Sequence, residues 1–161
     1  MITQERLKEI LHYDPETGIF TWLIKTKRRP KGSIAGSLSH GYLQIKISGK
    51  TYRSHRLAWL YVNGRWPNDV IDHINHNTAD NRIDNLRDVS RSMNQHNQIK
   101  APISNKTTGL LGATFNKEKQ KYHCHIVVEG KTKHIGYFPT AELAHEAYIK
   151  AKRIHQKGNT L

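Results

Sequence analysis

The middle of the chain has a composition that an ordinary hydrophobic core cannot use. Residues 53–98 contain five aspartates, no glutamate and eight asparagines, at positions 63, 68, 75, 77, 81, 85, 94 and 97. Asp and Asn side chains are mostly exposed in folded proteins, and their oxygens are the ligands that hard divalent cations prefer. We therefore predict that this segment builds a polar, cation-holding site on a small scaffold.

The segments on either side are strongly basic. The net formal charge is +5 over residues 1–52, +1 over residues 53–98 and +7 over residues 99–161, which gives +13 for the 161-residue chain. An excess of this size indicates a polyanionic partner. We expect the partner to be a nucleic acid, DNA or RNA, or an anionic surface.

Several protein classes are disfavoured by the sequence. The one cysteine, Cys124, excludes a disulfide scaffold and a thiolate zinc site. No apolar run approaches the roughly 18 residues of a membrane helix, and the first residues lack the apolar stretch of a signal peptide. We expect a soluble intracellular protein with no membrane partner.

The pattern of apolar residues predicts an α+β fold in four parts. A β-rich basic module over residues 1–52 contains a helix at 3–11, capped by Thr3, and strands at 19–23, 42–47 and 51–53. Residues 53–98 read as a helix at 55–62, strands at 70–71 and 86–89, and a helix at 91–97. Residues 99–107 read as a linker. Residues 108–161 read as strands at 110–115, 122–128 and 131–138, followed by a helix at 140–156.

The central segment contains the groups that phosphodiester hydrolysis needs. A hard divalent cation on oxygen ligands can stabilise the transition state and the leaving 3′ oxygen, and a neutral histidine can deprotonate water. Asp72 ends a predicted strand, and Asn94 comes 22 residues later, one turn into a predicted helix. We predict that Asp72 and Asn94 hold one cation, and that His73 faces another atom of the same phosphate.

Four separated motifs resemble the phage-type branch of the HNH homing endonuclease family: His55-Arg-Leu-Ala-Trp59, Val70-Ile-Asp-His-Ile74, Asn81-Arg-Ile-Asp-Asn-Leu86 and Ser90-Arg-Ser-Met-Asn94. The resemblance implies a ββα-metal unit in which Asp72 and Asn94 bind the metal and His73 is the general base. It implies that Asn85 orients the histidine and braces the loop. Asn94 stands where the family name has its final histidine. The implied cofactor is one Mg²⁺ or Mn²⁺, with Zn²⁺ or Ni²⁺ as alternatives.

The last part of the chain resembles the AP2 DNA-binding domain, a three-stranded antiparallel sheet packed on one helix. The motifs are Gly112-Ala-Thr-Phe115, Lys121-Tyr-His-Cys-His-Ile126, His134-Ile-Gly-Tyr-Phe-Pro139 and Thr140-Ala-Glu-Leu-Ala-His-Glu-Ala-Tyr148. The resemblance implies that the sheet contacts DNA. The expected contacts there are Asn116, Lys117, Lys119, Lys121, His123, Lys131 and Lys133, and those in the N-terminal basic loop are Lys25, Lys27, Arg28, Arg29 and Lys31.

The two resemblances together imply a metal-dependent DNA endonuclease that nicks duplex DNA and leaves a 5′-phosphate and a 3′-hydroxyl. The alternative is a non-catalytic, sequence-specific DNA-binding regulator. No protein partner is implied, a monomer is favoured over a dimer, and a phage-encoded chain would act in the cytoplasm of a bacterial host. His55 reads as a structural residue. Asn81 reads equally well as loop architecture or as support for the site.

Overall fold

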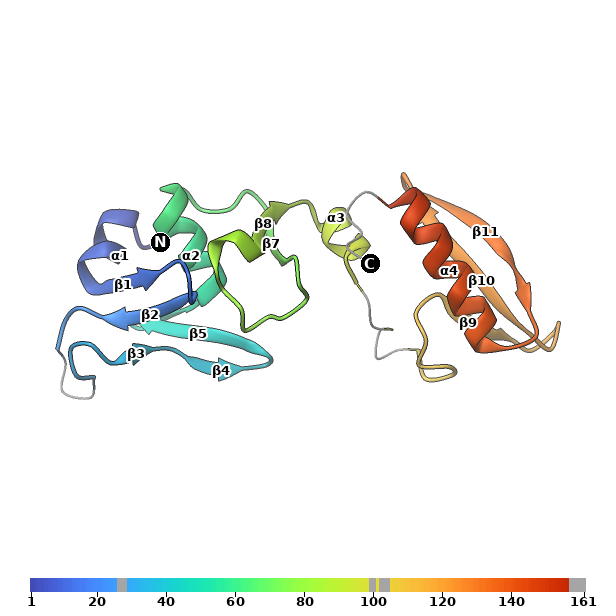
Figure 1. Cartoon of the computed structure of the whole chain (residues 1–161), viewed down its shortest axis with the longest axis horizontal. Coiled ribbons are helices and arrows are strands. Elements are labelled where there is room, and N and C mark those ends of the chain that lie inside the picture. Colours follow the sequence, from blue (N-terminus) through green and yellow to red (C-terminus); the bar gives the residue numbers. More distant parts are fainter. Residues whose placement is uncertain (26–28, 99–100, 102–104, 157–161) are drawn as a thin grey trace. The chain divides into compact units, whose positions relative to one another are not determined.

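The computed structural model describes residues 1–25, 29–98, 101 and 105–156. Its contacts divide the chain into two compact units, Met1–Arg91 and Ser92–Leu161. Each unit combines helices with small antiparallel sheets, so the predicted α+β class is confirmed (Figure 1). Within the described ranges, no helix is both long enough and apolar enough to cross a membrane.

Over its described residues, the first unit contains two helices, eight short strands and one 3-10 turn. The elements are α1 (Gln4–Ile10), β1 (Leu11–Asp14), β2 (Ile19–Trp22), β3 (Ile34–Ala35), β4 (Ser37–Ser39), β5 (Tyr42–Ile47), β6 (Lys50–Arg53), α2 (Ser54–Asn63), β7 (Val70–His73), the 3-10 turn η1 (Ile83–Asn85) and β8 (Leu86–Val89). Their sheets have the strand orders β1-β2-β3, β4-β5-β6 and β7-β8.

Local sequence signals set the ends of the two helices. The Thr3 hydroxyl accepts a hydrogen bond from the Arg6 amide, which confirms the predicted cap of α1. Helix α1 ends one residue before the predicted position, because Leu11 begins β1 and pairs with Trp22. Gly64 ends α2 in the left-handed conformation, with φ at 71°.

A hydrophobic core joins both helices of the first unit to most of its described strands. Leu7 of α1 and Leu57 of α2 are fully buried, and Ile71 of β7 and Leu86 of β8 join the same cluster. The segments predicted as an N-terminal module (1–52) and a nuclease domain (53–98) therefore meet in one compact unit up to Arg91. Their separate roles stay a prediction. The predicted linker, 99–107, lies largely outside the described residues.

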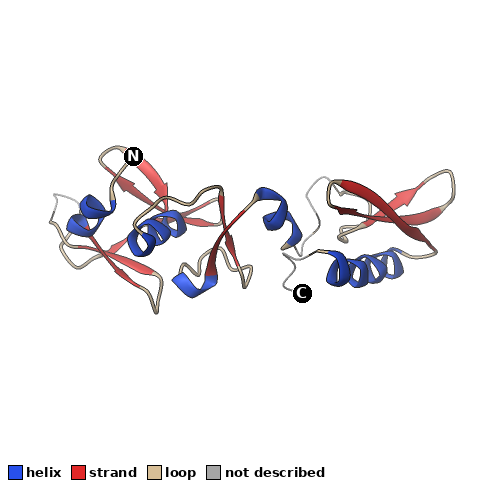
Figure 2. Ribbon diagram, turned by 90° about the horizontal axis from the view of Figure 1, so that it is seen from above, coloured by secondary structure: helices blue, strands red, loops and turns tan. Residues whose placement is uncertain are grey.

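The second unit is a three-stranded sheet covered by a helix. Helix α3 (Arg91–His96) begins at the last residue of the first unit, and β9 (Ala113–Asn116), β10 (Lys121–Val128), β11 (Lys131–Phe138) and α4 (Ala141–His155) follow. The strand order is β11-β10-β9 and all pairs are antiparallel. Helix α4 lies along one face of this sheet (Figure 2).

Small residues allow α4 to approach the sheet closely. Ala141 and Ala144 of α4 pack with Ala113 of β9 and with Cys124 of β10, and Cys124 is fully buried. The Thr140 hydroxyl accepts a hydrogen bond from the Leu143 amide and caps the helix. Strand β9 begins at Ala113 rather than at the predicted residue 110, because Gly112 takes φ +77° just before it.

Candidate active site

The two central residues of the predicted site end strand β7. The antiparallel register places Asp72 opposite Arg87 and His73 opposite Leu86. Both residues are buried, with exposed fractions of 6% for Asp72 and 4% for His73. The same hairpin contributes Ile71 and Leu86 to the core. The backbone that carries the carboxylate and the imidazole is therefore anchored by packing.

Asp72 is oriented by a charged neighbour. Arg87 Nε donates to Asp72 Oδ2 over 2.8 Å, and a second guanidinium nitrogen lies 2.7 Å from the same oxygen. Charge-assisted hydrogen bonds of this kind hold a carboxylate in a defined direction. A held carboxylate is a suitable ligand for a hard divalent cation.

His73 lies among ring side chains and one amide. Its Nε2 is 3.2 Å from Asn81 Oδ1, and its ring meets the His55 ring edge-on at 5.1 Å between centroids. Burial lowers the pKa of His73 below the usual histidine range, against the opposite effects of the Asn81 hydrogen bond and the Asp72 charge. The imidazole is therefore uncharged near neutral pH, as a general base must be.

His55 packs within this environment, next to His73, and its structural role stays a prediction. Its ring is buried at the start of α2 and lies 5.4 Å from the Tyr42 ring, which is itself 6.2 Å from the His73 ring. Burial lowers the pKa of His55 to about 3, with a smaller effect from His73. The two histidines can pack against each other because both are uncharged.

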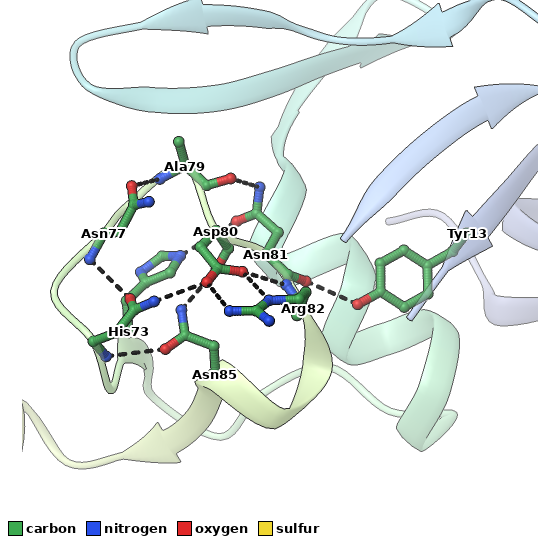
Figure 3. A network of polar contacts seen from close by, with 9 residues as sticks. Tyr13, His73, Asn77, Ala79, Asp80, Asn81, Arg82 and Asn85 are labelled. Carbon is green, nitrogen blue, oxygen red and sulfur yellow. Dashed lines mark hydrogen bonds and ion pairs between the residues drawn. The ribbon is translucent and has the colours of Figure 1, made fainter. Parts of the chain in front are cut away.

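Asn85 braces the loop between β7 and β8 (Figure 3). Its Oδ1 accepts from the Asn75 amide over 2.9 Å, and its Nδ2 donates to the Asp80 carbonyl over 2.8 Å. Asp80 in turn binds the Arg82 guanidinium through both carboxylate oxygens, and these contacts hold the pKa of Asp80 far below its usual range. The predicted bracing of the loop is seen directly, whereas the predicted orienting of His73 by Asn85 stays a prediction.

Asn81 was missed as a definite site residue. Its amide hydrogen-bonds to His73 and its exposed fraction is 1%. The sequence contained a signal, because Asn81 lies within one of the four motifs. Its contact with His73, eight residues earlier, could not be predicted from the local pattern of residue types alone.

Asn94 lies on α3, three residues beyond Arg91, in the second unit. Arg91 itself is tied to Asp69 at the approach to β7, through its amide at 3.1 Å and its guanidinium at 3.4 Å. The pairing of Asp72 with Asn94 around a metal stays a prediction. Over the described ranges, no three His, Cys, Asp or Glu side chains gather as metal ligands. The predicted donor set, one carboxylate and one amide, fits a cation that also keeps water and phosphate oxygens.

The N-terminal basic loop is described in part. Lys25 and Lys31 are exposed, whereas Lys27 and Arg28 lie outside the described residues. The Arg29 guanidinium stacks 4.6 Å from the Trp22 ring and donates to the Lys46 carbonyl over 3.0 Å. Arg29 is therefore half-buried against β2, and its DNA contact stays a prediction.

The predicted DNA contacts of the second unit are distributed over the sheet. The five lysines 117, 119, 121, 131 and 133 are exposed, and Asn116 and His123 are half-buried. Lys119 lies 4.1 Å from the Tyr137 ring centroid. Lys133 approaches His155 of α4 instead, with 3.4 Å between Nζ and Nε2.

The face of the sheet away from α4 also carries a cluster of histidines that the sequence interpretation missed. The His123 ring stacks on His125 at 5.1 Å and on His134 at 4.8 Å between centroids. His123 Nε2 lies 2.9 Å from His134 Nδ1. Partial burial and the neighbouring His125, His134 and Lys119 lower the pKa of His123. The alternation of positions 123 and 125 along a strand was the available signal.

The sequence of this hairpin lies within a match to a family of known proteins. A family described as HNH endonuclease matches residues 52–96. Protein 3.8 of Escherichia phage T7 is 32% identical over 107 residues, which are 66% of this chain and 87% of that protein. A solved structure described as DNA binding and cleavage by the HNH homing endonuclease I-HmuI has 24% identity and a TM-score of 0.43, over 92% of this chain and 88% of that chain. The family match contains Asp72, His73, Asn81, Asn85 and Asn94.

Proposed function

We propose that this chain, which belongs to the same family as Protein 3.8 of phage T7 and carries an HNH endonuclease domain, hydrolyses phosphodiester bonds in double-stranded DNA. The observation that carries the proposal is the setting of His73. A residue with a buried, uncharged imidazole directly follows one with an oriented carboxylate in β7, inside the segment that matches the HNH endonuclease family.

His73 is the proposed general base. As a water oxygen bonds to phosphorus, the imidazole accepts one proton from that water. The bond between phosphorus and the 3′ oxygen breaks, and the 3′ oxygen takes a proton from solvent. The products carry a 5′-phosphate and a 3′-hydroxyl, and one such site per chain favours a nick by a monomer.

Asp72 and Asn94 are the proposed ligands of one divalent cation, Mg²⁺ or Mn²⁺. When bound, the cation supplies the positive charge that stabilises the transition state and the leaving oxygen. Arg87 keeps the Asp72 carboxylate in place, which is the support that metal ligands commonly receive from a neighbouring group.

The basic residues outside the hairpin are the proposed DNA contacts. The second unit, for which we propose an AP2-like sheet, offers Asn116, His123 and the lysines 117, 119, 121, 131 and 133. Lys25, Arg29 and Lys31 extend the same role to the N-terminal loop. We expect the protein to act in the cytoplasm of a bacterial host.

A nicking assay on supercoiled plasmid tests the proposal. The wild-type chain is incubated with Mg²⁺, with Mn²⁺ and with EDTA, beside His73→Ala and the matched control His12→Ala, which changes an exposed histidine of β1 in the same unit. We expect metal-dependent open circle, unaffected by His12→Ala. His73→Ala should lose about 10²–10⁴ in rate.

A different result would identify the alternative functions. If no metal supports cleavage while the chain still shifts duplex DNA in a gel, the protein is a non-catalytic DNA-binding regulator or a nuclease so site-specific that the plasmid lacks its target. A stronger shift of RNA than of DNA with matched sequence would make RNA the partner.

A further inference from the structure

Asn81 is held on three sides by described groups. Its Oδ1 lies 3.2 Å from His73 Nε2, and its Nδ2 donates to the Ala79 carbonyl over 3.3 Å. Its own carbonyl accepts a hydrogen bond from the Tyr13 hydroxyl over 2.8 Å (Figure 3). Asn81 is 1% exposed, so its side chain cannot exchange these partners for hydrogen bonds to water.

These contacts determine which nitrogen of His73 carries the proton. Because a carbonyl can only accept, the Ala79 contact requires the NH₂ group of Asn81 on its side. The amide oxygen then faces His73, so Nε2 must donate. A neutral imidazole with hydrogen on Nε2 keeps its lone pair on Nδ1, and Nδ1 is then the nitrogen that can accept a proton.

Residues far away in sequence hold Asn81 in turn. Tyr13 of β1 is buried, and its ring packs at 4.8 Å on Phe20 and 5.6 Å on Tyr61. Burial raises the pKa of Tyr13 to about 12, so its hydroxyl keeps the proton that it donates to Asn81.

Gly18 contacts the backbone at the same place. It lies between β1 and β2 at φ +73°, and a Cβ there would come within 2.5 Å of Asn81 C and Arg82 N. The turn can pass this close only because Gly18 has no side chain.

We propose that Asn81 is a positioning residue that keeps His73 in the Nε2–H tautomer, and that Tyr13 and Gly18 of the N-terminal hairpin fix Asn81 for this task. The proposal rests on the nuclease function of His73 proposed above. According to this proposal, the N-terminal segment helps to align the general base His73, in addition to its predicted contacts with DNA.

The test uses the full chain and separates positioning from folding. Asn81→Leu removes the accepting oxygen at similar volume, and Asn81→Asp restores one. Tyr13→Phe removes only the hydroxyl, and Tyr52→Phe on β6 is its matched control, at a half-buried tyrosine of the same unit. Urea unfolding checks that each variant is folded.

Two readouts are needed. Nitrogen NMR of the His73 ring reports the tautomer, whether or not the chain cleaves DNA. The maximal single-turnover nicking rate is compared with the DNA concentration that gives half of that rate.

For Asn81→Leu we expect loss of the single Nε2–H tautomer and a maximal rate lower by about 10²-fold, with the half-saturating DNA concentration unchanged within about threefold. Asn81→Asp should recover the tautomer and most of the rate. Tyr13→Phe should lower the rate by about three- to tenfold, and Tyr52→Phe should not.

The proposal is overturned if Asn81→Leu keeps the Nε2–H tautomer, or if Tyr13→Phe and Tyr52→Phe behave alike in both readouts. Should Asn81→Leu fail to fold, Tyr13→Phe and Asn81→Asp decide by the same readouts. A wild type that never cleaves DNA refutes the proposed function, while the tautomer measurement still decides whether Asn81 positions His73.

Discussion

Arg87 lies directly opposite Asp72 in the β7–β8 ladder, and two of its guanidinium nitrogens contact one oxygen of the Asp72 carboxylate. The side chain of Asp72 is 7% exposed and that of Arg87 is 26% exposed. A carboxylate buried to this degree needs its positive partner, because an unpaired charge in the interior is costly.

Replacing Arg87 by Met should therefore destabilise the first unit by about 2–4 kcal/mol. Urea unfolding measures the loss. In the Asp72→Asn background the same replacement should cost much less, because the amide carries no charge that needs a partner. Equal costs in the two backgrounds would mean that Arg87 stabilises the hairpin by packing alone.

The first unit should lose stability in acid because of His55. Its pKa is about 3 in the folded chain and about 6.5 in an unfolded one, so the unfolded chain binds more protons between these values. The contribution of neutral His55 to the free energy of unfolding is fully present above about pH 6.5. It decreases as the pH drops toward 3, by at most about 1.4 kcal/mol per pH unit. His73 adds an effect of the same sign.

Urea midpoints measured at several pH values test this sign. His55→Phe, which keeps a ring against Tyr42 and His73, should flatten the dependence. His12→Gln, at an exposed position of β1, should leave it unchanged. A dependence that His55→Phe does not reduce would place the acid sensitivity elsewhere.

Local structure was predictable from the sequence where short-range signals act. The cap at Thr3, the glycine stop at Gly64 and strand β11 over Lys131–Phe138 all agree with expectation. Helix α4 differs by one residue at each end. These features depend on hydrogen bonds and side-chain alternation within a few residues, which a sequence displays directly.

Long-range pairing was not predictable in the same way. Strand β1 was missed although Leu11 and Tyr13 alternate with polar residues, because Leu11 was assigned to the preceding helix and the rest is too short to identify as a strand without its pairing with β2. The contact of Tyr13 with Asn81 joins residues 68 apart. The hydroxyl–carbonyl contact forms only when β1 and the loop between β7 and β8 fold into the same unit. No local pattern of residue types predicts such a contact.

Gly112→Ala should unfold the second unit selectively. Gly112 has φ +77°, and an added Cβ would lie 2.1 Å from the Tyr148 ring. Backbone strain and overlap together should cost about 2–4 kcal/mol. Gly109→Ala is the matched control, since φ is +66° there but no atom lies within 4 Å of an added Cβ.

Cys124 reports this unfolding. It is the single cysteine of the chain, it is fully buried, and burial raises the pKa of its thiol to about 11. A thiol reagent should modify native wild type very slowly and Gly112→Ala much faster, with Gly109→Ala between them. Similar labelling rates for the two glycine variants would show that the Tyr148 ring moves aside at little cost.

The salt dependence of DNA binding should locate the DNA-binding face of the second unit. If the whole chain neutralises about six phosphates, log Kd should depend on log salt with a slope of magnitude about 5.

Lys119 lies over the Tyr137 ring on the histidine-bearing face, and the register places Lys121 beside Asn116 on the neighbouring strand. Replacing both lysines by Gln should reduce the magnitude of the slope by about 1.8, or about 0.9 for each lost phosphate contact. The control replaces the exposed Lys150 and Arg153 of α4, which covers the other face, and removes the same charge. Equal reductions in the two double variants would show that net charge alone attracts DNA and that the sheet face makes no defined contact.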